Sequence, residues 1–183
     1  MDSNQESKWI NDLQDSARRS KAFGQLVKAY QQPLYWHIRK MVLSHDDAND
    51  ILQNTFMKAW SAIDSFRGDS KLSTWLFRIA VNEALTFLSN QRDKLNVSME
   101  ELQESMADHL ESDPYFSGDE MQLKLQKAIL SLPEKQRLVF NMKYFDDLKY
   151  EEMEQILGTS VGALKASYHY AVKKIEQYML NDI

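Results

Sequence analysis

The chain has 183 residues, no cysteine, and 22 basic against 27 acidic side chains, which gives a formal net charge of −5. This length fits one medium domain or two small ones. The lack of cysteine excludes disulfides, thiolate zinc sites and cysteine nucleophiles. No uncharged run approaches the roughly 18 residues that a membrane span needs, and the polar first twenty residues show no secretory signal. We therefore expect a cytoplasmic protein with no membrane insertion.

Apolar residues repeat with helical spacing along the first sixty positions, and no sustained strand alternation occurs in the chain. Residues 1–20 are interpreted as a tail or the start of the first helix. Positions 23–41 predict a first long helix that Pro33 disturbs. Ser44, followed by acids, resembles a capping box and opens a second helix. The predicted buried stripe of that second helix consists of Leu52, Phe56, Ala59, Trp60 and Ile63.

A polar loop at residues 64–73 leads into a third helix, predicted over residues 74–90. The loop combines an aromatic ring, cations, hydroxyls and the flexible Gly68 directly before that helix. Loops of this kind capture unstacked bases by stacking and polar contacts. Core packing explains most of the aromatic residues here. It explains less well the polar members Arg67, Ser70, Lys71 and Arg78.

The second helix also has an outward face, on which Met57 stands among polar residues. A methionine in such a setting suggests a contact surface for another protein. A solvated helix face with a single Met accounts for the same spacing equally well.

An acidic segment separates the two halves of the chain. Residues 99–120 carry eight acids and no Lys or Arg, and without them 22 basic residues stand against 19 acidic ones. The negative net charge therefore does not argue against nucleic-acid binding, which depends on local patches. We interpret the segment as a linker, in which residues 99–110 could form a transient or docked helix.

The C-terminal unit begins near Met121, and Ser131 with Pro133 predicts another helix start. Residues 148–174 predict a short amphipathic helix, a glycine turn, and a second helix capped by Ser160. From position 161 to 174 this last helix has three lysines and no acid. Its outer face starts with small residues that permit close approach to the major groove, and lysines suit phosphates. The pattern predicts a DNA-reading helix-turn-helix. The plainer alternative is a helical hairpin with a solvated basic face.

Two blocks resemble the second and fourth conserved domains of extracytoplasmic-function (ECF) sigma factors of bacterial RNA polymerase, within the sigma-70 family. Residues 46–94 contain TWL-x-x-IA-x-N, and residues 123–179 contain LP-x-x-x-R before the helix-turn-helix. The resemblance implies an all-α fold of two small helical domains, at residues 21–94 and 121–183, joined by a flexible acidic linker at 95–120. It implies a sigma factor that directs transcription initiation and is not an enzyme.

The resemblance also implies roles for the matching residues. One helix face would bind the clamp helices of the largest subunit of core RNA polymerase, and two regions would bind promoter DNA. An anti-sigma factor is a further implied partner. The implied polymerase-binding residues are Asp47, Asp50, Gln53, Asn54 and Met57. Those implied for melting the minus-ten element are Phe66, Arg67, Ser70, Lys71, Ser73, Trp75, Arg78, Asn82 and Arg92. Those implied for reading the minus-thirty-five element are Ser160, Val161, Gly162, Ala163, Lys165, Ala166, Ser167, His169, Tyr170 and Lys173.

Two departures from the family pattern concern these roles. Asn54 stands where the family often has an acid, which weakens one implied polymerase contact. Residues 163–167 read Ala-Leu-Lys-Ala-Ser where the family often has Thr-Val-Lys-Ser-Arg, so the base contacts do not carry over.

The linker has an implied role as well, because in the family it threads the basic RNA channel of the polymerase, where acids can imitate RNA. The segment from residue 93 to 120 can extend to about 90 Å. Promoter elements about 17 base pairs apart are separated by about 58 Å, so the linker is long enough.

The main alternative is a helix-turn-helix regulator or adaptor that binds duplex DNA without polymerase. Such a protein has no need of the aromatic loop at residues 66–75. An enzyme is a more distant alternative, because no phosphate loop, nucleophile elbow or zinc signature is present. The four histidines are scattered, at His37, His45, His109 and His169. We therefore expect no catalytic residue, metal or cofactor.

Overall fold

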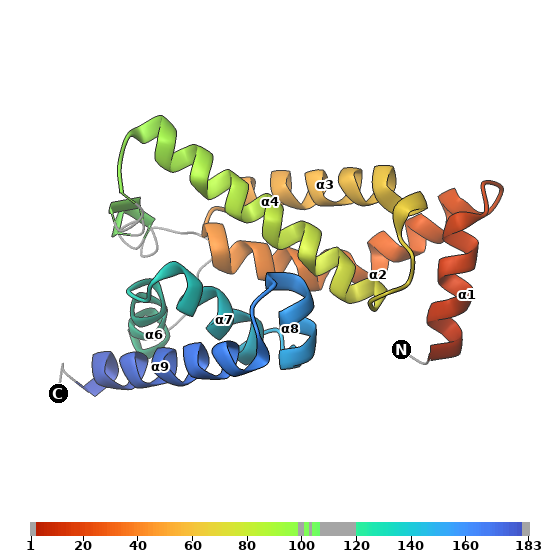
Figure 1. Ribbon diagram of the computed structural model, residues 1–183. Helices are drawn as coiled ribbons and strands as arrows, with labels where there is room; N and C mark the ends of the chain where they lie inside the picture. Colours follow the sequence, from red (N-terminus) through yellow and green to blue (C-terminus); the bar gives the residue numbers. More distant parts are fainter. Residues whose placement is uncertain (1–2, 99–100, 103, 107–119, 181–183) are drawn as a thin grey trace.

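The computed structural model describes residues 3–98, 101–102, 104–106 and 120–180, and it has no β-strand in these ranges. Its N-terminal part is a layer of long helices in which α2, α3 and α4 pack against one another, while α1 crosses one end (Figure 1). The elements are α1 (Ser3–Gln14), α2 (Arg19–Val42), α3 (His45–Ala62), the short 3₁₀ helix η1 (Ile63–Ser65) and α4 (Leu72–Leu95).

The N-terminal layer confirms the three predicted long helices and corrects three details. Residues 1–20, interpreted as a tail or the start of the first helix, contain a separate helix, α1, and α2 continues through Pro33. Because Leu34 and Ile38 are fully buried on the next turns, packing holds α2 together beyond the proline. Trp60 was wrongly placed in the buried stripe of α3. Ala59 and Ile63 take the core positions, and the Trp60 side chain is 43% exposed.

The C-terminal part forms a second layer below the first, in which α9 is the outermost helix (Figure 1). Helix α9 packs on α6, α7 and α8. A small apolar cluster between these helices contains Ile129, Phe140 and Ile175. The elements are α6 (Glu120–Leu130), α7 (Glu134–Tyr144), α8 (Tyr150–Leu157) and α9 (Val161–Leu180).

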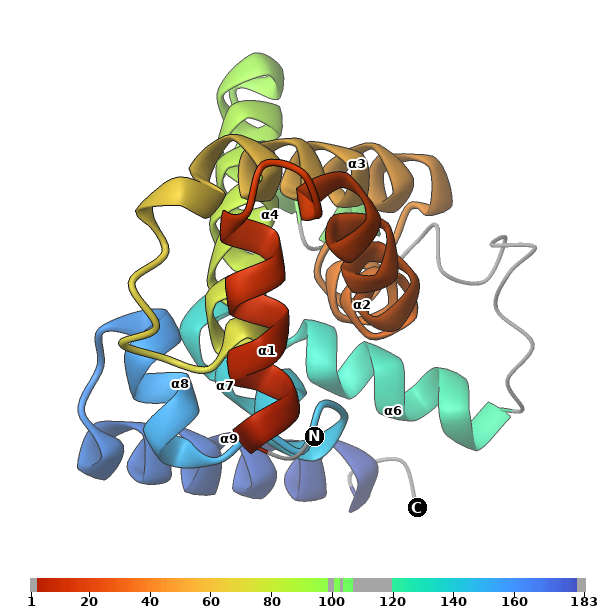
Figure 2. The ribbon, with the colours of Figure 1, turned by 90° about the vertical axis from the view of Figure 1, so that its right-hand side faces the viewer.

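The two layers are in direct contact, because α8 packs against α4 and α7 packs against α2. Figure 2 shows α7 and α8 beneath the lower end of α4, with α1 passing in front. One apolar cluster continues from Leu13 through Leu76 to Met153 and Leu164, so it draws residues from both layers. The structure therefore shows the helix-turn-helix packed against the long-helix layer.

The acidic linker lies mostly outside the described residues, but its start is described. Ser98 and Glu101 cap one another, since the Ser98 N–H donates to the Glu101 carboxylate at 2.6 Å and the Glu101 N–H donates to Ser98 Oγ at 3.1 Å. Leu102 is 4% exposed and joins the main core. Of residues 99–110, for which a transient or docked helix was considered, only 101–102 and 104–106 are described, and these are helical; the others lie outside the described residues. In the portion of the chain that the structure covers, no helix has the length and hydrophobicity to cross a bilayer.

Candidate nucleic-acid interface

The first candidate region is the loop between η1 and α4. Its cations Arg67 and Lys71 are exposed, and Gly68 has a positive φ of 77°, a conformation that glycine adopts without strain. Phe66 is only 5% exposed, with its ring centroid 5.0 Å from that of Trp75. In this conformation the buried Phe66 ring therefore packs beneath the surface of the loop, against Trp75. The half-buried Trp75 and the cations are the groups that a base could reach.

Helix α4 carries the rest of this region on its outer face. Arg78 and Asn82 are exposed and one turn apart, and they follow Trp75 at helical spacing. The Ser73 hydroxyl is already hydrogen-bonded to Tyr30 of α2. At the far end of the helix the Arg92 guanidinium pairs with Asp93 at 2.9 Å. Trp75, Arg78 and Asn82 thus form one continuous stripe beside the loop, while Arg92 lies about five turns from Ser73 along the helix.

The second candidate region is the helix-turn-helix formed by α8 and α9. Gly158 ends α8 with φ at 65°, and its N–H donates to the Glu154 carbonyl oxygen at 2.8 Å, as in an αL cap. The Ser160 hydroxyl accepts from the Ala163 N–H at 3.4 Å, and the Glu154 carboxylate accepts from the Val161 N–H at 3.3 Å. Both predicted turn signals are therefore confirmed.

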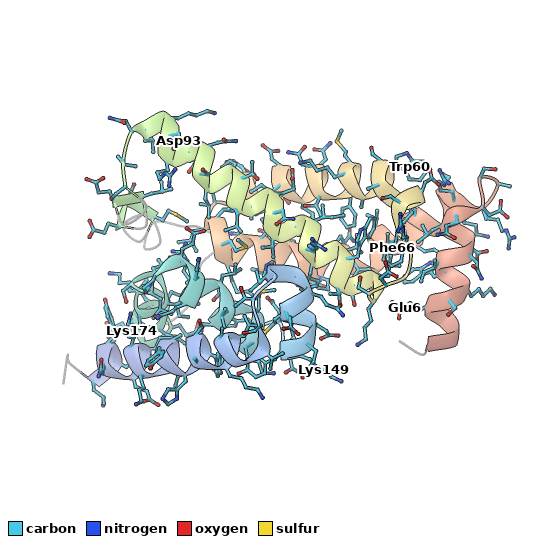
Figure 3. The ribbon with its side chains drawn as sticks, in the orientation of Figure 1. Glu6, Trp60, Phe66, Asp93, Lys149 and Lys174 are labelled. Carbon is cyan, nitrogen blue, oxygen red and sulfur yellow. The ribbon has the colours of Figure 1, made fainter. Side chains whose placement is uncertain are left out.

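The outward face of α9 contains small side chains first and cations later. Apolar residues at helical spacing from Val161 to Ile175 predict the inner face of α9, and three of them, Leu164, Ala171 and Ile175, are buried against the other helices. The Tyr170 side chain is 57% exposed, and the Lys165 ammonium lies 5.7 Å from the Tyr150 ring centroid. Figure 3 labels Lys149 and Lys174 at opposite ends of the α8–α9 layer. The exposed predicted residues are Ser160, Gly162, Ala163, Lys165, Ala166, His169, Tyr170 and Lys173, while Val161 and Ser167 are partly buried.

The predicted polymerase-binding residues share the outer face of α3. Asp47 is partly buried, whereas Asp50, Gln53, Asn54 and Met57 are exposed, with Met57 at 60%. Beside them runs an apolar groove between α2 and α3 that the sequence analysis did not foresee. Its spacing signal was available, because Trp60 follows Met57 by three residues on the same face. The groove is lined by Phe23, Val27, Gln53, Phe56, Met57, Trp60 and Ser61.

A buried polar cluster joins the two layers; we call His37, Lys40 and Asp146 the Asp146 cluster. Asp146 lies between α7 and α8, and its carboxylate contacts His37 Nδ1 at 2.5 Å and Lys40 Nζ at 2.9 Å, both on α2. The side chain of Asp146 is 6% exposed. Burial opposes its ionisation, but the hydrogen bonds and charges of His37 and Lys40 hold the pKa of Asp146 below its usual range.

The two candidate regions also touch. Lys71 Nζ of the loop contacts the Glu152 carboxylate of α8 at 2.7 Å. Burial of Glu152 opposes its charge, yet the hydrogen bond from Lys71 leaves the pKa of Glu152 lowered. A cavity at this junction is lined by α1, the loop and α8, including Glu6, Ser70 and Lys149. Among the described residues, no group of three His, Asp or Glu side chains is arranged to hold a metal ion.

Comparison with known proteins identifies both halves of the chain. Residues 26–94 match the Sigma-70 region 2 family and residues 122–175 match the Sigma-70 region 4 family. The ECF RNA polymerase sigma-E factor of Escherichia coli (strain K12) is 32% identical over 164 residues, which cover 85% of each chain. The RNA polymerase sigma-H factor of Pseudomonas aeruginosa is 29% identical over 181 residues, or 94% of this chain and 93% of the relative.

Solved structures agree on the fold. The sigma factor RpoE of Bartonella quintana, in complex with the anti-sigma factor NepR, aligns with a TM-score of 0.68 at 24% identity over 89% of this chain and 99% of its own. CnrH, in complex with the cytosolic domain of CnrY, aligns with a TM-score of 0.71 at 23% identity over 97% and 99%. On the sequence identity to sigma-E over most of both chains, this protein belongs to the ECF family of RNA polymerase sigma factors.

Proposed function

We propose that this sigma factor binds a promoter at two points, with two different kinds of surface. The loop at residues 66–73 and the stripe of Trp75, Arg78 and Asn82 hold an unpaired base of the minus-ten element. The outer face of α9 binds the duplex minus-thirty-five element. One observation carries the proposal. A single chain presents an exposed, cation-bearing loop beside the aromatic pair of Phe66 and Trp75, and also a helix, α9, that has no acid over residues 161–174 and is the second helix of a helix-turn-helix.

The outer face of α3 is the proposed contact with core polymerase, through Asp50, Gln53, Asn54 and Met57. Support comes from the exposure of these residues and from the apolar groove beside them, which Trp60 and Phe56 line. Exposed apolar surface rimmed by polar residues is typical of protein-binding sites. In this proposal residues 21–94 and 121–183 are the working domains and residues 95–120 are the linker that enters the RNA channel.

Two further parts of the proposal follow from the relatives. RpoE and CnrH were solved with proteins bound to them, NepR and a domain of CnrY. We propose an inhibitory partner of the anti-sigma kind for this chain too. Because the function depends on core polymerase, we place the protein in the cytoplasm. We also propose that it catalyses no reaction itself.

Reconstituted run-off transcription tests the function. Purified core polymerase and the full chain are incubated with a library of genomic promoters, and discrete transcripts are expected only when both proteins are present. Arg78→Ala is expected to reduce these transcripts at least about tenfold, the scale of one lost base or phosphate contact. Lys28→Ala, at an exposed cation of α2 outside the candidate regions, is the control. Absence of any transcript, with tight duplex binding by the chain alone, would instead favour the conventional regulator.

A further inference from the structure

Helix α1 is attached to both ends of the loop at residues 66–71, which we call the minus-ten loop after its proposed function. At the start of the loop, Gln14 Nε2 donates to the Phe66 carbonyl oxygen at 3.0 Å. At its end, the Glu6 carboxylate accepts from the Leu72 N–H, the first amide of α4, at 2.6 Å. Figure 3 labels Glu6 and Phe66 at the end of the molecule where α1 meets this loop. The two contacts span most of α1, so the helix bridges the loop from one end to the other.

Helix α1 is itself fixed in place. Leu13 is fully buried in the main core, and the Trp9 ring packs 6.3 Å from that of Tyr30 on α2. The guanidinium of Arg19 donates to the Leu13 carbonyl oxygen at 2.9 Å and forms an ion pair with Asp64, just before the loop. A rigid support of this kind can transmit a defined geometry to the loop.

The start of α4 needs an external acceptor because its own cap position cannot supply one. Lys71 occupies the N-cap in an extended conformation, and an ammonium group can only donate hydrogen bonds. Helices usually place Ser, Thr, Asp or Asn there to accept from the first free amides. The first turn of α4 also has no acidic residue to complement the helix dipole. Glu6 provides both the acceptor and the negative charge from another helix.

This arrangement leaves the cap position free for a cation. With Glu6 holding the Leu72 amide, Lys71 can extend its ammonium group away from the helix, where its side chain is 56% exposed. A serine or aspartate at position 71 would accept from the amide of Ser73 or Thr74, the usual partners of an N-cap, but would remove that cation from the loop. The distant cap is therefore compatible with phosphate or base contacts at residue 71, whereas a local cap is not.

We propose that Glu6 and Gln14 are positioning residues for promoter melting: by fixing the two ends of loop 66–71 they hold it in the shape that captures the unpaired minus-ten base. This inference rests on the proposed function of that loop. Neither residue touches DNA in this account, and both act through the backbone of Phe66 and Leu72. No role was predicted for this segment, which was interpreted as a tail or the start of the first helix.

The test uses holoenzyme reconstituted from the full chain and core polymerase, with a promoter found by run-off transcription. One probe carries the duplex minus-thirty-five element joined to a single-stranded non-template minus-ten element, with 2-aminopurine at the captured base. A second probe carries only the duplex element. The variants are Glu6→Met, which keeps length and helix propensity but has no strong acceptor, Glu6→Gln, which keeps an acceptor without charge, and Gln14→Met. Asp12→Asn is the control, because that α1 carboxylate pairs with Arg18.

Glu6→Met and Gln14→Met are expected to weaken binding of the single-stranded probe about three- to tenfold, the range for a lost helix cap at Glu6 and for a lost hydrogen bond at Gln14. The 2-aminopurine signal of unstacking should fall with it, Glu6→Gln should be intermediate, and Asp12→Asn should match the original chain. Affinity for the duplex probe and for core polymerase should not change. An equal loss on both probes would mean that α1 only stabilises the fold, and no loss on either would mean that it has no part in capture. Either result would overturn the proposed positioning role of Glu6 and Gln14. Neither would contradict the sigma-factor function, which fails only if the original chain opens no promoter.

Discussion

The two regions proposed to meet promoter DNA are built in opposite ways. The helix-turn-helix is stabilised largely from within, because Gly158, Ser160 and Glu154 satisfy the free backbone groups of the turn within a few residues. The minus-ten loop is held from outside. Its ends bond to α1, and Lys71 pairs with α8.

This difference has a functional consequence. A helix that reads duplex DNA needs one fixed shape. Caps between residues close in sequence can fix that shape at a small cost in chain entropy, because they close only short loops. A loop that accepts a flipped base must keep its own side chains available, so distant elements supply its support. We therefore expect the loop to be more sensitive than the helix-turn-helix to changes elsewhere in the molecule.

The largest expected effect comes from breaking a long-range contact. Asp146→Asn removes a buried charge from the Asp146 cluster and leaves Lys40 without its carboxylate. Removing one partner of a buried pair is strongly destabilising, and we expect a loss of about 3 kcal/mol at pH 7. The urea midpoint, followed by circular dichroism, measures it. Asp147→Asn is the control at the adjacent position, where the side chain is 98% exposed and Asn tolerates the positive φ of 49°.

The same cluster predicts a pH dependence. The folded pKa of Asp146 is lowered, so its contribution to stability is complete above the unfolded value of about 3.9 and is lost as the pH falls through the folded value. The stability difference between the original chain and Asp146→Asn should therefore shrink below about pH 4. A constant difference from pH 7 to pH 3 would show that the carboxylate charge contributes nothing.

A smaller effect tests the short-range contacts of the helix-turn-helix. The same substitution, glycine to alanine, is made at Gly158 in the turn and at Gly24 inside α2. An added Cβ meets nothing within 4 Å at either Gly24 or Gly158, so backbone conformation alone decides the outcome. Gly158→Ala forces a positive φ on alanine and should cost about 1 kcal/mol. Gly24→Ala lies inside α2 and should stabilise the protein by up to about 1 kcal/mol. Destabilisation at both sites would mean that Gly158 has no special conformational role.

The same division between local and distant contacts explains what the sequence could predict. Ser44, Gly158 and Ser160 act on neighbours three or four residues away, and each is recognisable from residue type and spacing. The helical pattern and most of the inner face of α9 followed from apolar periodicity alone. These parts of the fold were predictable because their causes lie within one or two helical turns.

The distant contacts left no comparable trace. Glu6 caps an amide 66 positions away, and His37 meets Asp146 across 109 positions. Nothing in either local sequence distinguishes those acids from solvated ones. Trp60 shows the same limit, because its exposure depends on which face of α3 the rest of the layer covers. The roles of the site residues themselves stay predictions, which the transcription and binding experiments decide.

The smallest expected effect concerns the point where the two regions touch. Glu152→Gln removes the ion pair to Lys71, whose side chain is 56% exposed, so the loss of stability should stay below about 1 kcal/mol. Lys71 would then no longer be shared between α8 and DNA, and the affinity of the free chain, in which the two regions touch, for the single-stranded minus-ten probe should rise about twofold at low salt. Glu151→Gln, next to it and exposed, removes the same charge without that contact. If both variants raised affinity equally, general charge would be the cause. A rise with Glu152→Gln alone would show that the contact between the two regions competes with promoter binding.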